Sequence, residues 1–203
     1  MSNTPNGASA LQNALQQICS GITVESRSMF VPDSLEFNQA EQIGALLFDL
    51  EEVNRFAVGD FLNHCERVFR EGWTQLLSEK LAKRMNTIEN WRYTCRSVSP
   101  TIRRSDLTMA AHYAVASLKS ELLQEQLLRL CAEEQLPSDD LGDLAKLFRD
   151  MDQSEQFGWG EKIWQNEMSV AEVLEAYEEA LPKTEEATPA IIAGPVVLSD
   201  KLV

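Results

Sequence analysis

The chain has 203 residues, of which 44% are hydrophobic, and it carries a formal net charge of −14. That hydrophobic share suffices for a packed core, but no apolar run approaches the ~20 residues that a membrane-spanning helix needs. The N-terminus shows no basic start followed by an apolar stretch, so we expect no secretion signal and no membrane partner.

Cysteine and histidine are too dispersed along the chain to suggest a metal site. No CxxC pair occurs, and a zinc site needs a closer set of ligands. We therefore expect buried, reduced thiols in a cytosolic protein, with no metal and no cofactor. The residues concerned are Cys19, Cys65, Cys95, Cys131, His64 and His112.

The pattern of residues 1–33 predicts an N-terminal extension. Leu11, Leu15 and Ile18 fall at helical spacing and predict a short amphipathic helix that ends at Gly21. The β-prone pieces that follow, up to Pro32, predict either a strand pair or extended chain.

From residue 34 to residue 151 the pattern is helical. Asn38 is a candidate N-cap, with Glu41 as its capping-box partner, for a helix that reaches Val53. We expect Gly59 to bend or interrupt the next run and Gly72 to end it.

The stretch Thr74–Val98 predicts two helices with a tight break at Lys83–Asn86, and Pro100 ends the second helix. An apolar stripe at helical spacing predicts the inner face of this second helix: Ile88, Trp91, Cys95 and Val98. The predicted outer face is polar: Thr87, Glu89, Asn90, Arg92, Tyr93, Thr94 and Arg96.

Three more helices are expected before residue 152. Thr108 is expected to cap the first, which runs to about residue 118 and holds His112 as a packed residue. Residues 121–134 form the second, and Ser138 is expected to cap the third.

Residues 152–181 predict a C-terminal helical extension, in which we expect Gly158–Gly160 to break the chain and Ser169 to cap a last acidic helix. Residues 182–203 are rich in Pro, Thr, Ala and Glu without a period, which predicts a flexible acidic tail. The expected fold is thus mainly α, a multi-helix domain that contains a helix-turn-helix, followed by a flexible tail.

Positive charge gathers in one window of this acidic chain. From Arg67 to Arg104 there are nine basic and three acidic residues, so the window carries +6 and the rest of the chain −20. Nucleic-acid phosphates are contacted by Lys and Arg, and distant charges are screened over about 10 Å at ordinary salt. The window therefore favours DNA binding in spite of the net charge.

The helices around this window also follow a known order. After Val98-Ser-Pro100 come Leu107-Thr-Met-Ala-Ala-His-Tyr-Ala-Val-Ala116, Leu123-Gln-Glu-Gln-Leu-Leu128 and Leu136-Pro-Ser-Asp-Asp-Leu141. In this order and spacing, residues 81–146 resemble the helix-turn-helix region of ParB/KorB-type DNA-binding proteins. Upstream, Gly59-Asp-Phe-Leu-Asn63 and Glu71-Gly-Trp73 are similar to helical DNA-binding proteins of phages and plasmids.

The resemblance, which covers residues 34–151, implies DNA binding. Two parts of true ParB proteins have no counterpart in the chain: the N-terminal nucleotide-binding domain with its Arg-rich motif, and a long C-terminal dimerisation domain. Residues 152–181 are long enough for a smaller version of the latter. The resemblance therefore does not imply partition or nucleotide-driven clamping.

A recognition helix places its N-terminal residues against base edges in the major groove. We expect Asn90 to pair with adenine, and Arg92 or Arg96 to pair with guanine or phosphate. Thr87 and Tyr93 are expected to reach phosphates. The other expected DNA-binding residues are Asn86 at the helix start, Lys80, Lys83 and Arg84 at the break, and Arg103 and Arg104 beyond Pro100.

We interpret the sequence as that of a sequence-specific, nucleoid-associated DNA-binding protein, a transcriptional or mobile-element regulator. A homodimer is expected because single helix-turn-helix units usually need two half-sites. The alternative is a helical protein–protein adaptor that uses its acidic surface and binds no DNA.

The Glu-rich segment 167–186 leaves three interpretations open: a solvated face, a surface for a protein partner, or a segment that folds over the basic window. The chain holds no Ser/His/Asp set, Gly-rich phosphate loop or HExxH motif, so we do not expect an enzyme.

Overall fold

The computed structural model describes residues 5–49, 55–69, 75 and 85–181, and the predicted tail at 182–203 lies outside this part. The described elements are, in chain order, α1 (Pro5–Ile18), β1 (Thr23–Val24), β2 (Met29–Phe30), α2 (Phe37–Asp49), α3 (Arg55–Phe69), α5 (Met85–Ser97), α6 (Met109–Val115), α7 (Glu121–Glu133), α8 (Ser138–Phe148), α9 (Gln153–Gln165) and α10 (Val170–Ala180).

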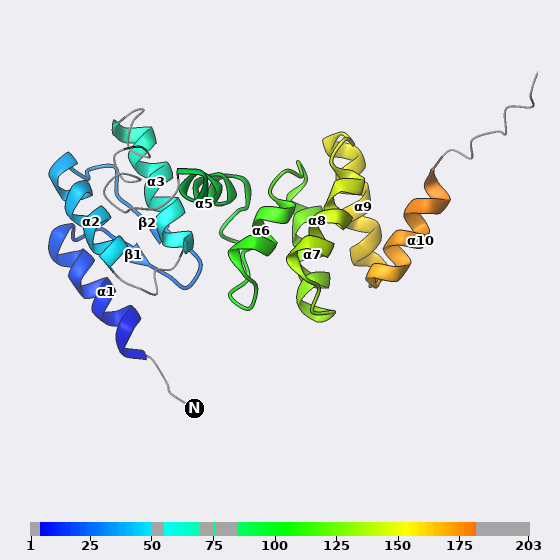
Figure 1. The fold of residues 1–203 in the computed structure, drawn as a ribbon, viewed down its shortest axis with the longest axis horizontal. Coiled ribbons are helices and arrows are strands. Elements are labelled where there is room, and N and C mark those ends of the chain that lie inside the picture. Colours follow the sequence, from blue (N-terminus) through cyan, green and yellow to red (C-terminus); the bar gives the residue numbers. More distant parts are fainter. Residues whose placement is uncertain (1–4, 50–54, 70–74, 76–84, 182–203) are drawn as a thin grey trace, which may run out of the picture.

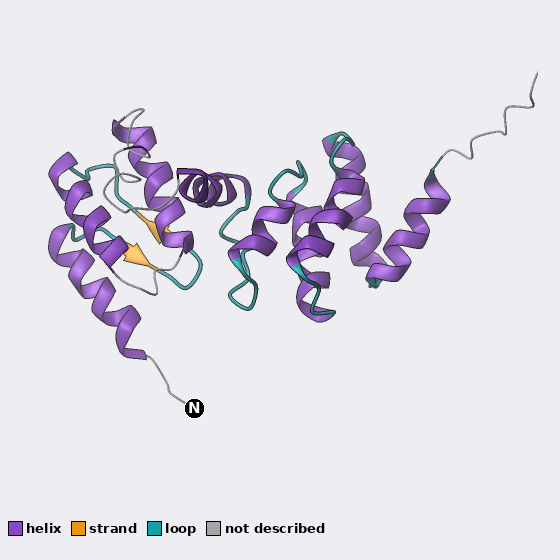
Figure 2. Ribbon diagram, viewed as in Figure 1, coloured by secondary structure: helices purple, strands orange, loops and turns teal. Residues whose placement is uncertain are grey.

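The described part is mainly helical, as expected, with one short hairpin as its β structure (Figure 2). The elements follow one another along the long axis of the molecule, from α1 at one end through α5 to α10 at the other (Figure 1). None of the described helices is both long enough and apolar enough to cross a membrane.

The N-terminal half is built on one core shared by α1, the hairpin, α2 and α3. Leu15, Ile43 and Phe61 are fully buried in it. The strand pair is present, with Thr23 opposite Phe30 in an antiparallel register. The first helix and the hairpin therefore belong to the same packed unit as α2 and α3.

The C-terminal half has its own core, formed by α6 to α10. Leu123, Phe148 and Val173 are fully buried there. Tyr177 of α10 packs edge-on against Phe148, with ring centroids 5.6 Å apart, and its hydroxyl donates to the Leu147 carbonyl at 3.1 Å. The last helix is thus fastened to α8 by apolar and polar contacts.

Several helix starts agree with the sequence. The Thr108 side chain accepts from the Ala111 amide at the start of α6, and Ser169 forms a capping box with Glu172 at the start of α10. Each cap satisfies amide groups that have no partner within their helix.

Three expected boundaries are wrong. Asn38 is not the N-cap, because α2 already begins at Phe37, and the Glu36 amide before it donates to Gln39 Oε1 at 3.0 Å. Ser138 is the first residue of α8 and makes no capping bond, because Pro137 holds the cap position. Residues 158–160 do not break the chain but lie within α9.

Two glycines allow helices to approach closely. A Cβ on Gly59 of α3 would lie 2.4 Å from the Cys95 sulfur and 2.6 Å from the Trp91 carbonyl oxygen. A Cβ on Gly160 of α9 would lie 2.9 Å from the Leu123 nitrogen of α7. Glycine is used at both positions for packing between helices, not to interrupt a helix.

We expect Gly59→Ala to lower the free energy of unfolding by about 1–3 kcal/mol or more, because α3 and α5 must separate to admit the methyl group. Gly158→Ala is the matched control, since a Cβ there meets nothing within 4 Å and alanine favours a helix by about 0.5–1 kcal/mol. Urea denaturation of both variants measures the difference. Equal stabilities would contradict the proposed close approach.

Candidate nucleic-acid interface

The inner stripe of α5 packs as the sequence predicts. Ile88 and Val98 are fully buried and Cys95 is 6% exposed, while Trp91 is half-buried against the N-terminal core. α5 therefore lies on α3 through its apolar side. Thr94, expected on the outer face, is also fully buried, and its hydroxyl donates to the Asn90 carbonyl at 2.7 Å.

The outer face of α5 carries three exposed polar side chains, from Asn86, Asn90 and Arg96, and a half-buried Thr87. Tyr93 is half-buried, and its hydroxyl donates to the Ala116 carbonyl at 3.2 Å. To contact phosphate as expected, Tyr93 would have to give up this hydrogen bond within the fold.

Arg92 joins α5 to α3. Its guanidinium forms ion pairs with Glu66 of α3 and, at 2.8 Å, with Glu89 of its own helix. The Arg92 side chain is 21% exposed. Base or phosphate contact by Arg92 would have to displace both carboxylates, so we assign it to holding the two helices together.

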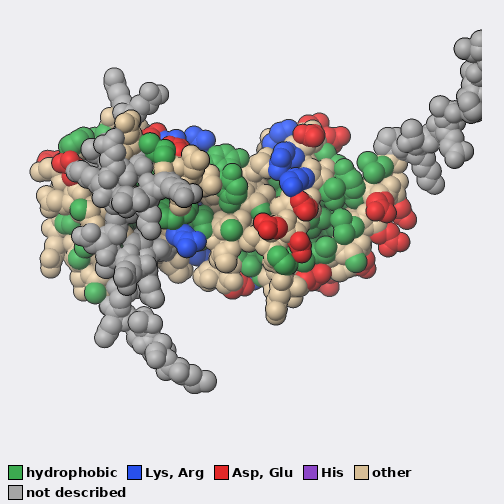
Figure 3. Space-filling view, in the orientation of Figure 1, with side chains coloured by type: hydrophobic (Ala, Val, Ile, Leu, Met, Phe, Trp, Pro, Cys, Tyr) green, Lys and Arg blue, Asp and Glu red, His purple; other side chains and the backbone are tan. Residues whose placement is uncertain are grey.

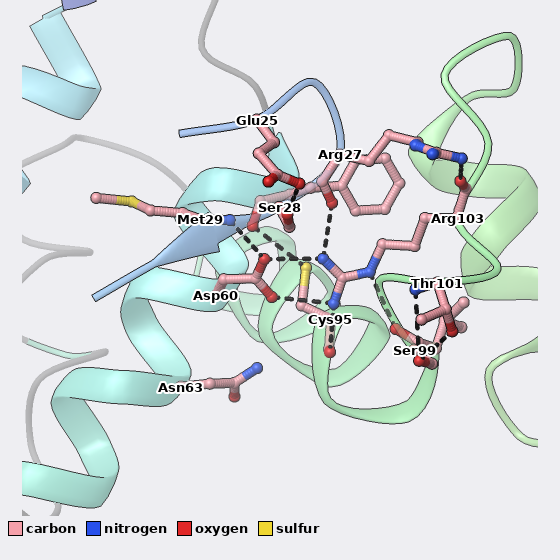
Figure 4. Close-up of polar contacts among 12 residues, drawn as sticks. Glu25, Arg27, Ser28, Met29, Asp60, Asn63, Cys95, Ser99, Thr101 and Arg103 are labelled. Carbon is pink, nitrogen blue, oxygen red and sulfur yellow. Dashed lines mark hydrogen bonds and ion pairs between the residues drawn. The ribbon is translucent and has the colours of Figure 1, made fainter. Parts of the chain in front are cut away.

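The expected phosphate contact of Arg103 is wrong, because the side chain is fully buried. Its guanidinium pairs with both oxygens of Asp60, at 2.8 and 2.9 Å (Figure 4). The remaining N–H groups donate to the carbonyls of Val98, Cys95 and Arg27, at 3.0, 2.7 and 2.9 Å. All five donors of a guanidinium are thus used inside the protein.

Arg104 lies on a different surface from the outer face of α5. Its guanidinium pairs with Asp106 at 2.8 Å, and this hydrogen bond raises the pKa of Arg104. Arg104 lines a small hollow with Arg27 and Arg129, whereas Arg96 does not. The arginines of the basic window therefore do not form one face. Lys80, Lys83 and Arg84 lie outside the described residues.

A groove of about 1030 Å³ opens between the hairpin, α3 and α5. Arg92 and Arg96 line it from α5, and Asn63, His64 and Arg67 line it from α3. These α3 residues are not among the DNA-binding residues that the sequence predicts. A signal was present in the sequence, because the polar residues 60, 63, 64 and 67 recur at helical spacing and so share one side of the helix.

His64 is the unusual residue of this groove. It is 7% exposed, and its Nδ1 lies 3.2 Å from the Arg67 guanidinium, so Nδ1 accepts and the proton sits on Nε2. That Nε2–H is buried and has no hydrogen-bond partner among the described residues, a situation that costs about 1–3 kcal/mol. Burial, and then the charge of Arg67, lower the pKa of His64 and keep the ring neutral.

The thiols of α3 and α5 are structural. Burial raises the pKa of Cys65 and of Cys95 to about 12, so both stay protonated at neutral pH. All four cysteines are free and buried. A thiol in this state is a poor nucleophile and a poor metal ligand.

Charge is unevenly spread over the face seen in Figure 3. Asp and Glu side chains gather toward the α10 end, and Lys and Arg form separate small groups instead of one continuous field. No protein-family model, curated protein or solved structure matches the chain.

We expect Asp60→Ala to lower the free energy of unfolding by about 3–5 kcal/mol, since it leaves the buried Arg103 charge without its carboxylate. Asp143→Ala is the control, because it breaks an exposed pair with Lys146, and such pairs contribute little. Urea denaturation compares the two variants. A loss no larger for Asp60→Ala than for Asp143→Ala would show that the buried pair is not needed.

Stability should fall as the pH drops below about 6.5, before the carboxylates titrate. His112 is fully buried, its Nδ1 donates to the Thr108 carbonyl and its Nε2 accepts from the Arg104 amide. Burial lowers the pKa of His112 below its ordinary 6.5, as it does for His64. The unfolded chain therefore takes up protons first on acidification, and the folded state loses stability until its own histidines titrate.

Urea midpoints between about pH 7.5 and pH 5 measure this loss, in the window set by the histidines. Ring ¹⁵N shifts follow each histidine separately in the folded chain. A histidine that titrates at or above 6.5 in the folded chain, or a flat stability profile across this window, would contradict the assignment.

Proposed function

We propose that the chain is a sequence-specific DNA-binding protein, a transcriptional or mobile-element regulator that reads the major groove with the outer face of α5. The observation that supports this most directly is the division of α5 into two sides. Its apolar stripe is bound to α3, while Asn86 and Asn90 near its N-terminus are exposed. An amide side chain carries the donor and the acceptor that pair with an adenine edge.

The proposed contacts are fewer than the sequence alone suggested. Asn86 and Asn90 read bases, and Thr87 and Arg96 contact phosphate beside them. Lys80, Lys83 and Arg84 stay in the proposal as phosphate contacts. Arg104 does not, because it lies on another surface and is paired with Asp106. Arg92 and Arg103 contribute by holding α5 in place through Glu66 and Asp60.

The proposal includes a homodimer, because two recognition helices on neighbouring half-sites give useful affinity where a single helix does not. A dimer selects a motif with two halves related by two-fold symmetry, with centres about one helical turn of DNA apart. A two-fold symmetric motif would therefore indicate a dimer, and a single half-site would indicate a monomer.

Selection from a random duplex library tests the proposal. We expect the wild-type chain to enrich one motif. Asn86→Ala with Asn90→Ala should weaken binding to that motif by about thirtyfold or more, because each of the two lost base pairings contributes roughly 1–3 kcal/mol. Affinity for unrelated duplexes should change little, because phosphate contacts remain.

The matched control is Gln153→Ala with Gln165→Ala, which removes two exposed amides from α9 instead. Loss of the motif in this control, or enrichment that survives the asparagine changes, would refute base reading by α5. Absence of any enrichment by the wild-type chain would refute the DNA-binding function itself.

One observation favours the second candidate, a protein–protein adaptor. Trp164 of α9 is 60% exposed and Leu174 of α10 is 42% exposed. Acidic side chains gather near this end of the molecule (Figure 3). Apolar side chains beside carboxylates suit a basic amphipathic partner, so a selection without enrichment would make this the better assignment.

A further inference from the structure

We propose that the groove between the hairpin, α3 and α5 binds the phosphate group of a nucleotide, either free in solution or within a DNA strand. Three parts of the chain far apart in sequence build its walls: residues 28–33, the polar side of α3 and the second half of α5. Its volume of about 1030 Å³ is large enough for a small ligand, since such pockets span roughly 300–1,000 Å³.

The charge of the groove is positive in a strongly acidic chain. Four arginines and three carboxylates line it, which leaves one formal positive charge. At its inner wall, Arg103 and Asp60 neutralise each other (Figure 4). Arg96 is exposed and has no ion-pair partner within the described ranges, so its charge is available to a ligand.

Two hydrogen-bond donors of the groove have no acceptor among the described residues: the exposed guanidinium of Arg96 and the buried Nε2–H of His64. Arg67 donates to both His64 and Asp33. A ligand that satisfies this set must bring acceptors and negative charge, as an oxyanion does.

Two features favour phosphate on a nucleotide over a simple carboxylate. Guanidinium groups match the geometry of phosphate and hold it by paired hydrogen bonds. Phe30, which also lines the groove, is 64% exposed and offers its ring to a base. Stacking of bases on aromatic side chains is tolerant of base identity.

This site shares Arg96 with the proposed DNA contacts, but it does not include the two asparagines proposed to read bases. At 3.6 residues per turn, Arg96 and Asn90 lie roughly a third of a turn apart around α5. Asn86 and Asn90 do not line the groove. Phosphate binding here therefore neither requires base reading nor follows from it.

Two exposed residues allow changes that should act in opposite directions. Arg96→Gln removes the unpaired charge and should weaken binding about fivefold. Asp33→Asn removes the carboxylate that competes for Arg67, and it should tighten binding by a similar factor. Arg149→Gln is the control, because it removes an exposed charge from α8's end, outside the groove, and should leave the affinity unchanged.

Ring ¹⁵N spectra provide the readout, since His64 and His112 are the two histidines of the chain. Inorganic phosphate, adenosine monophosphate, acetate and a short random-sequence duplex are titrated separately. We expect the phosphate-bearing probes to shift His64 and to leave His112 unchanged, because both nitrogens of His112 are bonded within the fold.

The outcomes separate the sources of phosphate. Shifts with adenosine monophosphate identify a free nucleotide, and shifts with the duplex alone identify a DNA strand. Three results would each overturn the proposal. His64 does not shift with any phosphate probe, acetate at the same concentration shifts it equally, or neither Arg96→Gln nor Asp33→Asn changes the affinity. Because the base-reading variants leave this groove intact, a failed DNA selection with a positive His64 titration would refute the proposed function alone.

Discussion

The buried pair between Arg103 and Asp60 is the interaction on which the arrangement of the two halves depends. Asp60 belongs to α3, and it also accepts from the Met29 amide of the hairpin at 3.0 Å. Arg103 lies between α5 and α6 and donates to the carbonyl of Arg27 in the hairpin turn. A buried charge is tolerated only when its partner and its remaining hydrogen bonds are all present. Here one guanidinium finds all of its acceptors in three segments of the chain: the hairpin turn, α3 and the end of α5.

The same arginine completes the end of α5. The last carbonyls of a helix lack partners within it, and positive charge near this end is favourable. Arg103 donates to the Cys95 carbonyl, and Gln124 of α7 donates to the Ser97 carbonyl at 3.3 Å. The C-terminal end of α5 is thus fixed by both halves of the molecule. Its other end, with Asn86 and Asn90, faces outward, which is the geometry that a reading helix needs.

Periodicity predicted the described helices and their inner faces well, because burial of an apolar stripe is a local consequence of the sequence. The stripe from Ile88 to Val98 is the clearest case. The predictions that failed concern residues whose position depends on contacts with residues far away in the sequence. Arg103 was assigned to the surface because arginines are rarely buried, and its carboxylate lies 43 residues away in the chain. Gly160 suggested a break, but its place is set by contact with Leu123 of α7, which the local pattern does not reveal.

Ion pairs within the protein reduce the positive charge that the basic window, Arg67–Arg104, can offer to DNA. Of its arginines that the structure describes, four are in ion pairs, with Asp33, Glu66, Asp60 and Asp106 among the partners. When an arginine is already paired with a carboxylate, it neutralises a DNA phosphate less effectively. Fewer of the counterions condensed on the DNA are then released. Counting basic residues therefore overstates the attraction of this part of the chain for a phosphate backbone.

Arg96 keeps its charge unpaired among the described residues of the window, and it stands where the outer face of α5 meets the groove. Any anion drawn to this surface, whether a DNA strand or a small ligand, is therefore drawn first to that position.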